Sequence, residues 1–191
     1  MKLRPFDPDT DFERIRSWAS DKKAHAMWCA NRFPYPLERN GFLAVLSGLA
    51  QRTGDIPFSL VTGGGQTAGF LCCMPDPVSG EGKLKFVIVD PVFRGTGAAQ
   101  EMLRLACRYA FEEMKAVRVS LSVFSQNVRA KRAYEKAGFT EIRTEHQAFA
   151  FGDERWDRCL MALEKGRFAE MKGFDGPASG AEQEDSGAER V

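Results

Sequence analysis

The sequence lacks the features expected of a membrane, secreted or metal-bound protein. No apolar run is long enough to cross a bilayer, and the first residues hold no long apolar segment typical of a secretory signal. The five cysteines are an odd number and form no CxxC pair, which disfavours structural zinc and a disulfide framework. No stretch rich in lysine and arginine alternates with aromatic residues, as nucleic-acid-binding surfaces often do. We therefore expect a cytoplasmic protein with reduced cysteines that binds no membrane, nucleic acid or metal.

What is present is typical of one globular domain. The chain has 191 residues, of which 43% are hydrophobic and 28% are charged, and this is enough for a sizeable core. The net charge of +1 is unevenly distributed, because residues 173–191 carry five acidic side chains and one arginine. This segment is also rich in Gly, Ala and Ser and has no periodic apolar positions. We predict one folded domain over residues 1–165 and a flexible acidic tail over residues 166–191.

Hydrophobic periodicity predicts a mixed α/β domain of the α+β kind. A helical N-terminal part comes first, then a β-hairpin, and then strands and helices that alternate along the chain. The predicted helices cover residues 11–19, a segment capped by Asp21, and residues 37–51, 98–114 and 127–139. The predicted strands cover residues 2–6, 56–62, 67–74, 83–89, 117–123, 140–151 and 155–163.

The junction between strand 83–89 and helix 98–114 is the first candidate site. Its sequence, RGTGAA over residues 94–99, places an arginine and two glycines in the connection between the strand and the helix. It is not a Walker A loop, because no Gly-Lys-Ser/Thr follows, and Gln100 stands where a dinucleotide fingerprint has its third glycine. Two explanations stay open. The glycines form a tight turn, or the backbone N–H groups at the helix N-terminus bind an anion such as a phosphate.

A second candidate block is SQNVRAKRAYEKAGF, over residues 125–139. Asn127, Ala130 and Tyr134 lie on one face of the predicted helix, and Gly138 is suited to end that helix in a left-handed conformation. A capping asparagine and a core tyrosine are also common in helices that have no catalytic function. This block alone leaves a structural role and a functional role open.

Together the two blocks resemble the GNAT superfamily of N-acetyltransferases. Residues 94–99 are similar to its pyrophosphate loop, Q/R-x-x-G-x-G/A, and a strand with an Asp-Pro pair precedes them, while Asn127, Tyr134 and Gly138 follow in the family's order. Within the superfamily, the chain most resembles the branch of the protein and ribosomal-protein N-acetyltransferases. The resemblance implies a GNAT-like single domain with a mixed, mostly antiparallel sheet, a splayed central strand pair and flanking helices. It also implies an acetyl-CoA-dependent N-acetyltransferase.

The resemblance further implies roles for individual residues. The loop would hold the pyrophosphate of acetyl-CoA through its backbone amides and Arg94. The amide of Val87 would bind the thioester carbonyl, and the amide of Val89 and the side chain of Asn127 would hold the pantetheine arm. Tyr134 would protonate the departing thiolate. The residues implied in binding the coenzyme are Val87, Val89, Arg94, Gly95, Thr96, Gly97, Ala98, Ala99 and Asn127.

The sequence departs from the family at the general base. Some members carry a glutamate four residues before the carbonyl-binding position, and this residue is Lys83 here. Glu81 is close but out of register, and Glu145 and His146 belong to a late strand that could border the substrate. Histidine has a pKa suited to a base near neutral pH. A water chain or an amine that is already deprotonated would serve as well, so the base is left unassigned.

No cysteine has an evident histidine partner, so we expect direct attack of a primary amine on the thioester rather than an acyl-enzyme. The acceptors that the resemblance implies are a protein N-terminus, a lysine, or a small molecule such as a polyamine or an aminoglycoside. Trp28, Phe33 and Tyr35 either form a wall of its site or pack a helix onto the sheet. The alternative function is a catalytically inactive domain that binds CoA or acetyl-CoA as a sensor, or that binds a partner. Whether the chain forms a homodimer stays open.

Overall fold

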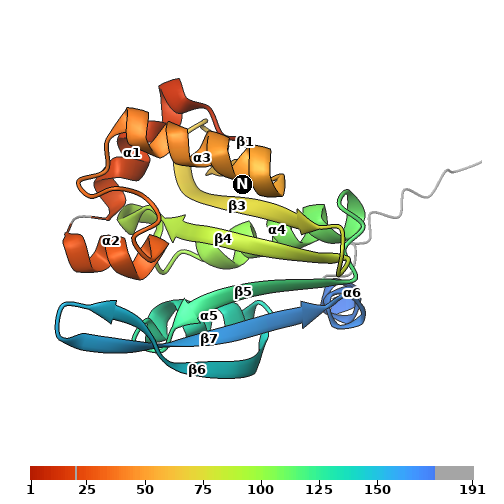
Figure 1. The fold of residues 1–191 in the computed structure, drawn as a ribbon. Coiled ribbons are helices and arrows are strands. Elements are labelled where there is room, and N and C mark those ends of the chain that lie inside the picture. Colours follow the sequence, from red (N-terminus) through yellow and green to blue (C-terminus); the bar gives the residue numbers. More distant parts are fainter. Residues whose placement is uncertain (20, 175–191) are drawn as a thin grey trace, which may run out of the picture.

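The computed structural model describes residues 1–19 and 21–174, which form one seven-stranded sheet with helices on both faces (Figure 1). The strand order is β1-β2-β3-β4-β5-β7-β6, and every neighbouring pair is antiparallel except β4 and β5. The strands are β1 (Lys2–Pro5), β2 (Ile56–Val61), β3 (Thr67–Asp76), β4 (Glu81–Val89), β5 (Arg118–Phe124), β6 (Thr140–Phe151) and β7 (Glu154–Glu164).

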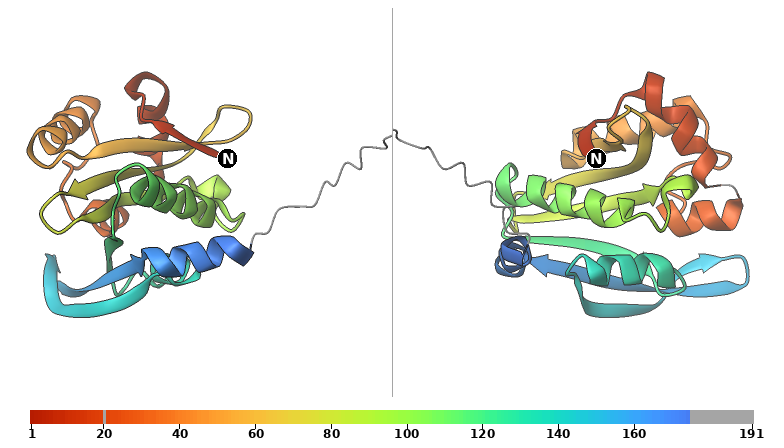
Figure 2. Two further views of the ribbon diagram at one scale, coloured as in Figure 1. Left: turned by 90° about the vertical axis from the view of Figure 1, so that its right-hand side faces the viewer. Right: turned by 180° about the vertical axis from the view of Figure 1, so that it is seen from behind.

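Helices cover both faces of the sheet (Figures 1 and 2), and each face has its own hydrophobic core. The first three pack on one face around Phe12, Phe42 and Phe70, and the last three lie on the other face, around Met102 and Leu121. No helix in the described part of the chain is both long and apolar enough to cross a membrane. The helices are α1 (Pro8–Trp18), α2 (Lys22–Cys29), α3 (Arg39–Thr53), α4 (Ala98–Glu112), α5 (Val128–Lys136) and α6 (Lys165–Phe174), with a 3-10 turn, η1 (Pro91–Phe93), between β4 and α4.

β4 and β5 pair over only part of their length. Glu81–Leu84 lies opposite Arg118–Leu121, and beyond these residues the strands diverge, so that the rest of β4 has no partner on the β5 side. A bulge interrupts the pairing of β4 with β3, and Phe86 adopts a left-handed φ of 54° there. The predicted fold, a mostly antiparallel sheet with a splayed central strand pair, is confirmed.

Every predicted helix and strand is present, with small differences at their ends. The first helix begins at Pro8, three residues earlier than predicted, because Asp7 caps it by accepting the N–H of Asp9 at 3.0 Å. The predicted cap of α2 is confirmed, since Asp21 accepts a backbone N–H of that helix at 2.8 Å. Gly138 follows α5 with a φ of 91°, the left-handed conformation expected of it.

The sequence pattern did not predict α6. This helix begins at Lys165, and its Phe168 is buried against Phe111 of α4, with ring centroids 5.1 Å apart. The packed part of the chain therefore extends beyond the boundary expected after residue 165. A short helix with one buried aromatic ring is held by tertiary packing and has little periodicity of its own. The rest of the tail prediction, for residues 175–191, lies outside the described residues.

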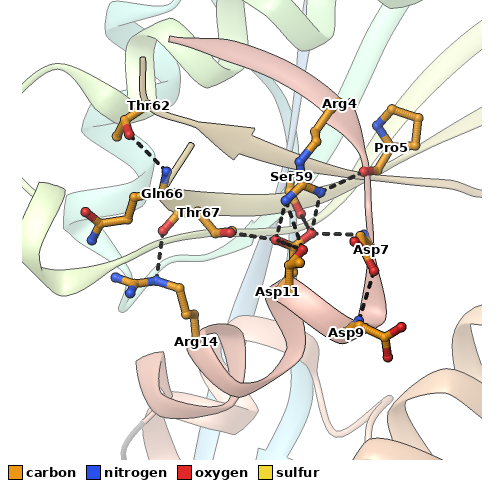
Figure 3. Close-up of polar contacts among 11 residues, drawn as sticks. Arg4, Pro5, Asp7, Asp9, Asp11, Arg14, Ser59, Thr62, Gln66 and Thr67 are labelled. Atoms are coloured by element: carbon orange, nitrogen blue, oxygen red, sulfur yellow. Dashed lines mark hydrogen bonds and ion pairs between the residues drawn. The ribbon is translucent and has the colours of Figure 1, made fainter. Parts of the chain in front are cut away.

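A buried carboxylate, Asp11 of α1, ties three strands to this helix (Figure 3). Arg4 of β1 donates two hydrogen bonds to it at 2.7 Å, Ser59 of β2 donates one at 2.6 Å, and Thr67 of β3 donates one at 2.5 Å. Burial alone would raise the pKa of Asp11, but these hydrogen bonds outweigh it and lower the pKa to about 2. Arg14, one helical turn later, donates to the backbone oxygen of Thr67 at 3.2 Å, so α1 is fixed against the start of β3.

Candidate active site

A cavity of about 750 Å³ opens where β4 and β5 diverge, and its volume is within the range of small-molecule sites. Its walls come from α4 and α5 on one face of the sheet and from α1 and α2 on the other, because the sheet is open there. The structure brings together most of the residues singled out in the sequence, whereas Thr96 and Ala98 do not line the cavity. The predicted residues that line it are Val87, Val89, Arg94, Gly95, Gly97, Ala99, Asn127 and Tyr134.

The unpaired end of β4 presents backbone donors to this cavity. Across the β3–β4 pair, the N–H of Asp90 donates to the carbonyl of Ala68 at 3.0 Å. Because N–H groups alternate in direction along a strand, the amide of Val89 points away from β3, toward the side that β5 leaves open. Val87 also lines the cavity, but it lies in the bulge between Lys85 and Ile88, where this alternation is interrupted. A bound molecule can therefore pair with β4 as a further strand would.

Two glycines in a left-handed conformation shape the loop after β4. Gly95 has a φ of 83° and Gly97 a φ of 88°, and these left-handed angles disfavour any residue other than glycine at either position. The space beside both glycines is open, because a β-carbon on either would meet no atom within 4 Å. Gly97 precedes α4, and the first helical hydrogen bond runs from the N–H of Glu101 to the Gly97 oxygen at 3.0 Å. The N–H groups of residues 98–100 thus have no partner within the helix. They lie at the positive end of its dipole, next to open space, and this favours an anion.

Thr96 and Ala98 belong to the loop, but their side chains have structural roles. The Thr96 hydroxyl donates to the carbonyl of Phe93 at 2.8 Å. Ala98 is 2% exposed and belongs to the core beneath the loop. The small size of this side chain is explained by its packing against the core.

Every charged side chain that lines the cavity, among the residues described, is basic: Arg94, Arg129, Arg132 and Lys136. Partial burial lowers the pKa of Arg94, and the positive charge of Arg129 lowers it further. Arg94 is held beside the open strand edge, because its Nε donates to the Val89 oxygen at 3.3 Å. Like charges placed this close together favour a bound anion that offsets their repulsion.

Asp90 anchors the start of the loop. It is 4% exposed, and one carboxylate oxygen accepts the N–H of Val92 at 3.0 Å while the other accepts a hydrogen bond from Arg14, also at 3.0 Å. The Arg14 side chain therefore connects α1 to the turn that leads into the glycine loop. Sequence reasoning missed this pair, because 76 positions separate the two residues and no local pattern relates them.

Asn127 and Tyr134, the residues singled out in and beside α5, each have a polar group without a hydrogen-bond partner among the described residues. Asn127 caps the helix, since its Oδ1 accepts the N–H of Ala130 at 3.2 Å, while its side-chain nitrogen donates to no other described residue. Tyr134 is 6% exposed, and its hydroxyl forms no hydrogen bond with another described residue. Burial raises the pKa of Tyr134 well above its ordinary value, so the phenol keeps its proton at neutral pH.

α2 bridges the two halves of the split sheet. On one side the Nε1 of Trp28 donates to the Phe86 oxygen, at the β4 bulge, at 2.8 Å. On the other side Lys23 pairs with Glu154 of β7 at 2.7 Å. The helix therefore lies across the opening between β4 and β5. The cavity residues from α2 are Ala24, Met27 and Trp28.

Of the three aromatic residues expected either to line an acceptor site or to pack a helix, Trp28 lines the cavity. Phe33 is 1% exposed and stacks on Trp28 with ring centroids 5.3 Å apart, so the packing explanation holds for it. Tyr35 is exposed and does not reach the cavity wall.

The residues considered as general bases lie outside the cavity lining. Glu81 forms an ion pair with Arg118 at the paired end of β4. His146 is exposed on β6 and pairs with Asp157 at 3.0 Å. The lining contains no aspartate, glutamate or histidine among the described residues, so the base stays unassigned.

One cysteine does have a histidine neighbour, contrary to the expectation from sequence. The Sγ of Cys29 lies 3.6 Å from the Nδ1 of His25, one helical turn away and within the same buried environment. Burial raises the pKa of Cys29 and lowers the pKa of His25, so both side chains are neutral at pH 7. Neither lines the cavity, and the pair gives no support to an acyl-enzyme.

Comparisons with known proteins agree with this geometry. Residues 1–140 match the family described as acetyltransferase (GNAT) domain. The fold is similar to spermidine N-acetyltransferase from Vibrio cholerae solved with CoA and spermine, with a TM-score of 0.75 and 18% identity over 88% of this chain and 97% of that one. A chimera of spermidine N-acetyltransferase from Vibrio cholerae and hSSAT gives a TM-score of 0.73 and 16% identity over 89% and 99% of the two chains.

These matches do not confirm the protein and ribosomal-protein branch suggested by the sequence. At this level of identity the solved structures show the fold alone. The family match, however, spans more than half of the chain and includes β4, the glycine loop and α5. The chain belongs to the GNAT family and is an acetyl-CoA-dependent N-acetyltransferase.

Proposed function

We propose that the cavity binds acetyl-CoA with its pyrophosphate at the glycine loop and transfers the acetyl group directly to a primary amine. The unpaired N–H groups of residues 98–100 and the open space beside Gly95 and Gly97 fit a phosphate that approaches the backbone closely. Arg94 and Arg129 supply positive charge at the same place.

The open edge of β4 fits the pantetheine arm. The amide of Val89 and the side-chain nitrogen of Asn127 are donors without a described partner on this side, and both residues line the cavity. The coenzyme supplies an acetyl group activated as a thioester. The amide of Val87 donates to the acetyl oxygen, and a fixed donor of this kind stabilises the negative charge that this oxygen gains during attack.

Tyr134 supplies the proton that the leaving group needs. As the carbon–nitrogen bond forms and the carbon–sulfur bond breaks, the phenol donates to the sulfur, which leaves as a thiol. The amine nitrogen loses a proton to solvent in the same reaction, and the phenolate is then reprotonated. The raised pKa of Tyr134 ensures that the hydroxyl starts protonated.

The amine enters in its neutral form. The α1 and α2 end of the cavity is lined by tryptophan, alanine and methionine side chains, and a desolvated environment of this kind lowers the pKa of an ammonium group. A neutral amine needs no carboxylate or histidine to remove a proton before attack. This agrees with the absence of such side chains from the described lining.

One observation carries the proposal. At the divergence of β4 and β5, a single cavity joins unpaired backbone donors, a group of basic side chains and a buried tyrosine. Small-molecule amines and protein amines are both candidate acceptors, and the similar solved structures are spermidine N-acetyltransferases. A cytoplasmic location stays a prediction, and whether the chain forms a homodimer stays open.

The experiment is a panel of primary amines and peptides incubated with acetyl-CoA, with CoA thiol release as the readout and calorimetry of CoA binding in parallel. Thiol release that depends on the amine supports transfer. Binding with no release for any amine would instead support the alternative, a sensor that binds the coenzyme without catalysis. Absence of binding would refute the assignment of the cavity.

Tyr134→Phe tests the acid. This change removes only the hydroxyl and keeps the buried ring, so coenzyme affinity and folding should hold. General acid catalysis is worth about 10²–10⁴-fold, and we expect a single-turnover rate lower by the low end of that range, because a thiolate leaves fairly easily. A rate within about twofold of wild type, well under this range, would show that Tyr134 only packs.

A further inference from the structure

The two ends of the cavity differ in chemistry. The charged lining residues come from the glycine loop and α5, on one face of the sheet: Arg94, Arg129, Arg132 and Lys136. The opposite end, formed by α1 and α2, has no charged side chain among the described lining residues. This apolar end consists of Trp18, Ala19, Ala24, Met27 and Trp28.

The Trp28 indole and the two carboxylates nearest to α2, those of Asp21 and Glu154, already have partners. The Trp28 indole nitrogen donates to the Phe86 oxygen at 2.8 Å. The Asp21 carboxylate accepts a backbone N–H of α2 at 2.8 Å. Glu154 accepts from Lys23 at 2.7 Å and from the Trp156 indole at 2.9 Å. Neither carboxylate lines the cavity, so within residues 1–19 and 21–174 the apolar end offers no counter-charge to a bound cation.

We infer that the acceptor is a primary amine carried on an uncharged apolar skeleton, and that polyamines are poor substrates. The inference rests on the proposed function and concerns which amine the site accepts. A second ammonium group in the apolar end would lose water without gaining a partner, which is costly. An alkyl chain, in contrast, gains from contact with Met27 and the two tryptophans.

This selectivity differs from that of the similar solved enzyme, which was crystallised with spermine. At 18% identity the shared fold does not carry the substrate with it. The side chains that line the apolar end determine which amine binds, and in this chain they favour an amine with a hydrocarbon skeleton.

The test compares hexylamine with 1,6-diaminohexane. The two share chain length and reacting group and differ only in the distal ammonium. With acetyl-CoA saturating and thiol release as the readout, we expect kcat/KM for hexylamine to be at least about tenfold higher, after division of the diamine value by its two equivalent ends. Equal values, or a preference for the diamine, would overturn the inference while leaving the acetyltransferase function intact. No release with any amine would refute the proposed function itself.

Met27 offers a matched pair of variants. It is partly exposed, and glutamate and glutamine have a similar length, so both should fold. Met27→Glu places a carboxylate in the apolar end and should shift the preference toward the diamine by about tenfold, the effect of one new ion pair of partial burial. Met27→Gln, with the same shape and no charge, should keep the wild-type preference for hexylamine. An identical amine preference in the two variants would show that Met27 does not face the acceptor.

Discussion

Replacing Asp11 by asparagine should destabilise the protein in a way that depends on pH. The carboxylate accepts hydrogen bonds from Arg4, Ser59 and Thr67, and asparagine can replace only part of them, because its amide nitrogen cannot accept. The difference between the lowered pKa of about 2 and the ordinary 3.8 corresponds to about 2 kcal/mol of stability at neutral pH. We expect a loss of that size for Asp11→Asn at pH 7.

The sign of the pH dependence follows from the lowered pKa. A carboxylate whose pKa is lower in the folded state than in the unfolded state stabilises the fold fully at any pH above its unfolded pKa. This stabilisation disappears as the pH falls toward the pKa of the folded state. The wild type should therefore lose about 1 kcal/mol of this contribution by pH 3 and about 2 kcal/mol by pH 2. The variant has no such group, so the gap between the two proteins should narrow over the same range.

The assay is urea unfolding of wild type and variant at pH 7 and pH 3, with the free energy of unfolding as the measured quantity. Asp9→Asn is the matched control, since Asp9 lies in the same helical turn but is exposed, and its ion pair with Arg39 should contribute no more than about 1 kcal/mol. A gap between wild type and Asp11→Asn that is the same at both pH values would refute the electrostatic explanation and leave only altered packing.

Three further changes test the site. Ala99→Glu should weaken CoA binding at least about tenfold relative to Ala99→Gln, with Tm preserved, because an acidic residue suits the first turn of a helix but repels phosphate; equal CoA affinities in calorimetry would argue against the loop as the phosphate site. Trp28→Phe removes the donor to the Phe86 oxygen and should cost about 1 kcal/mol in urea unfolding; unchanged stability would contradict this. Arg14→Met should raise KM for acetyl-CoA more than it lowers kcat, with partial rescue by Arg14→Lys, and a fall in kcat alone would count against a positioning role through Asp90.

Much of the fold followed from local patterns in the sequence. The strict alternation in residues 117–123 and the apolar stripe in residues 98–114 each predict which face of a strand or helix is buried. The same faces are buried in the structure. The helix caps were predictable from local sequence for the same reason, since Asp21 and Gly138 act on backbone groups within a few residues. The glycine loop was also visible, because left-handed backbone at residues 95 and 97 demands glycine in whatever fold contains it.

What the tertiary structure decided lies between elements distant in the chain. The Arg14–Asp90 pair, the Trp28 hydrogen bond at the β4 bulge and the buried Asp11 join residues that no local pattern relates. The helix over residues 165–174 needs the ring of Phe168 to be buried, which only the core can provide. Whether a side chain faces the cavity or the core is likewise a property of packing. Composition and spacing could therefore identify the loop and the chemistry it favours, but only the opening between β4 and β5 shows that one end of the cavity is basic and the other apolar.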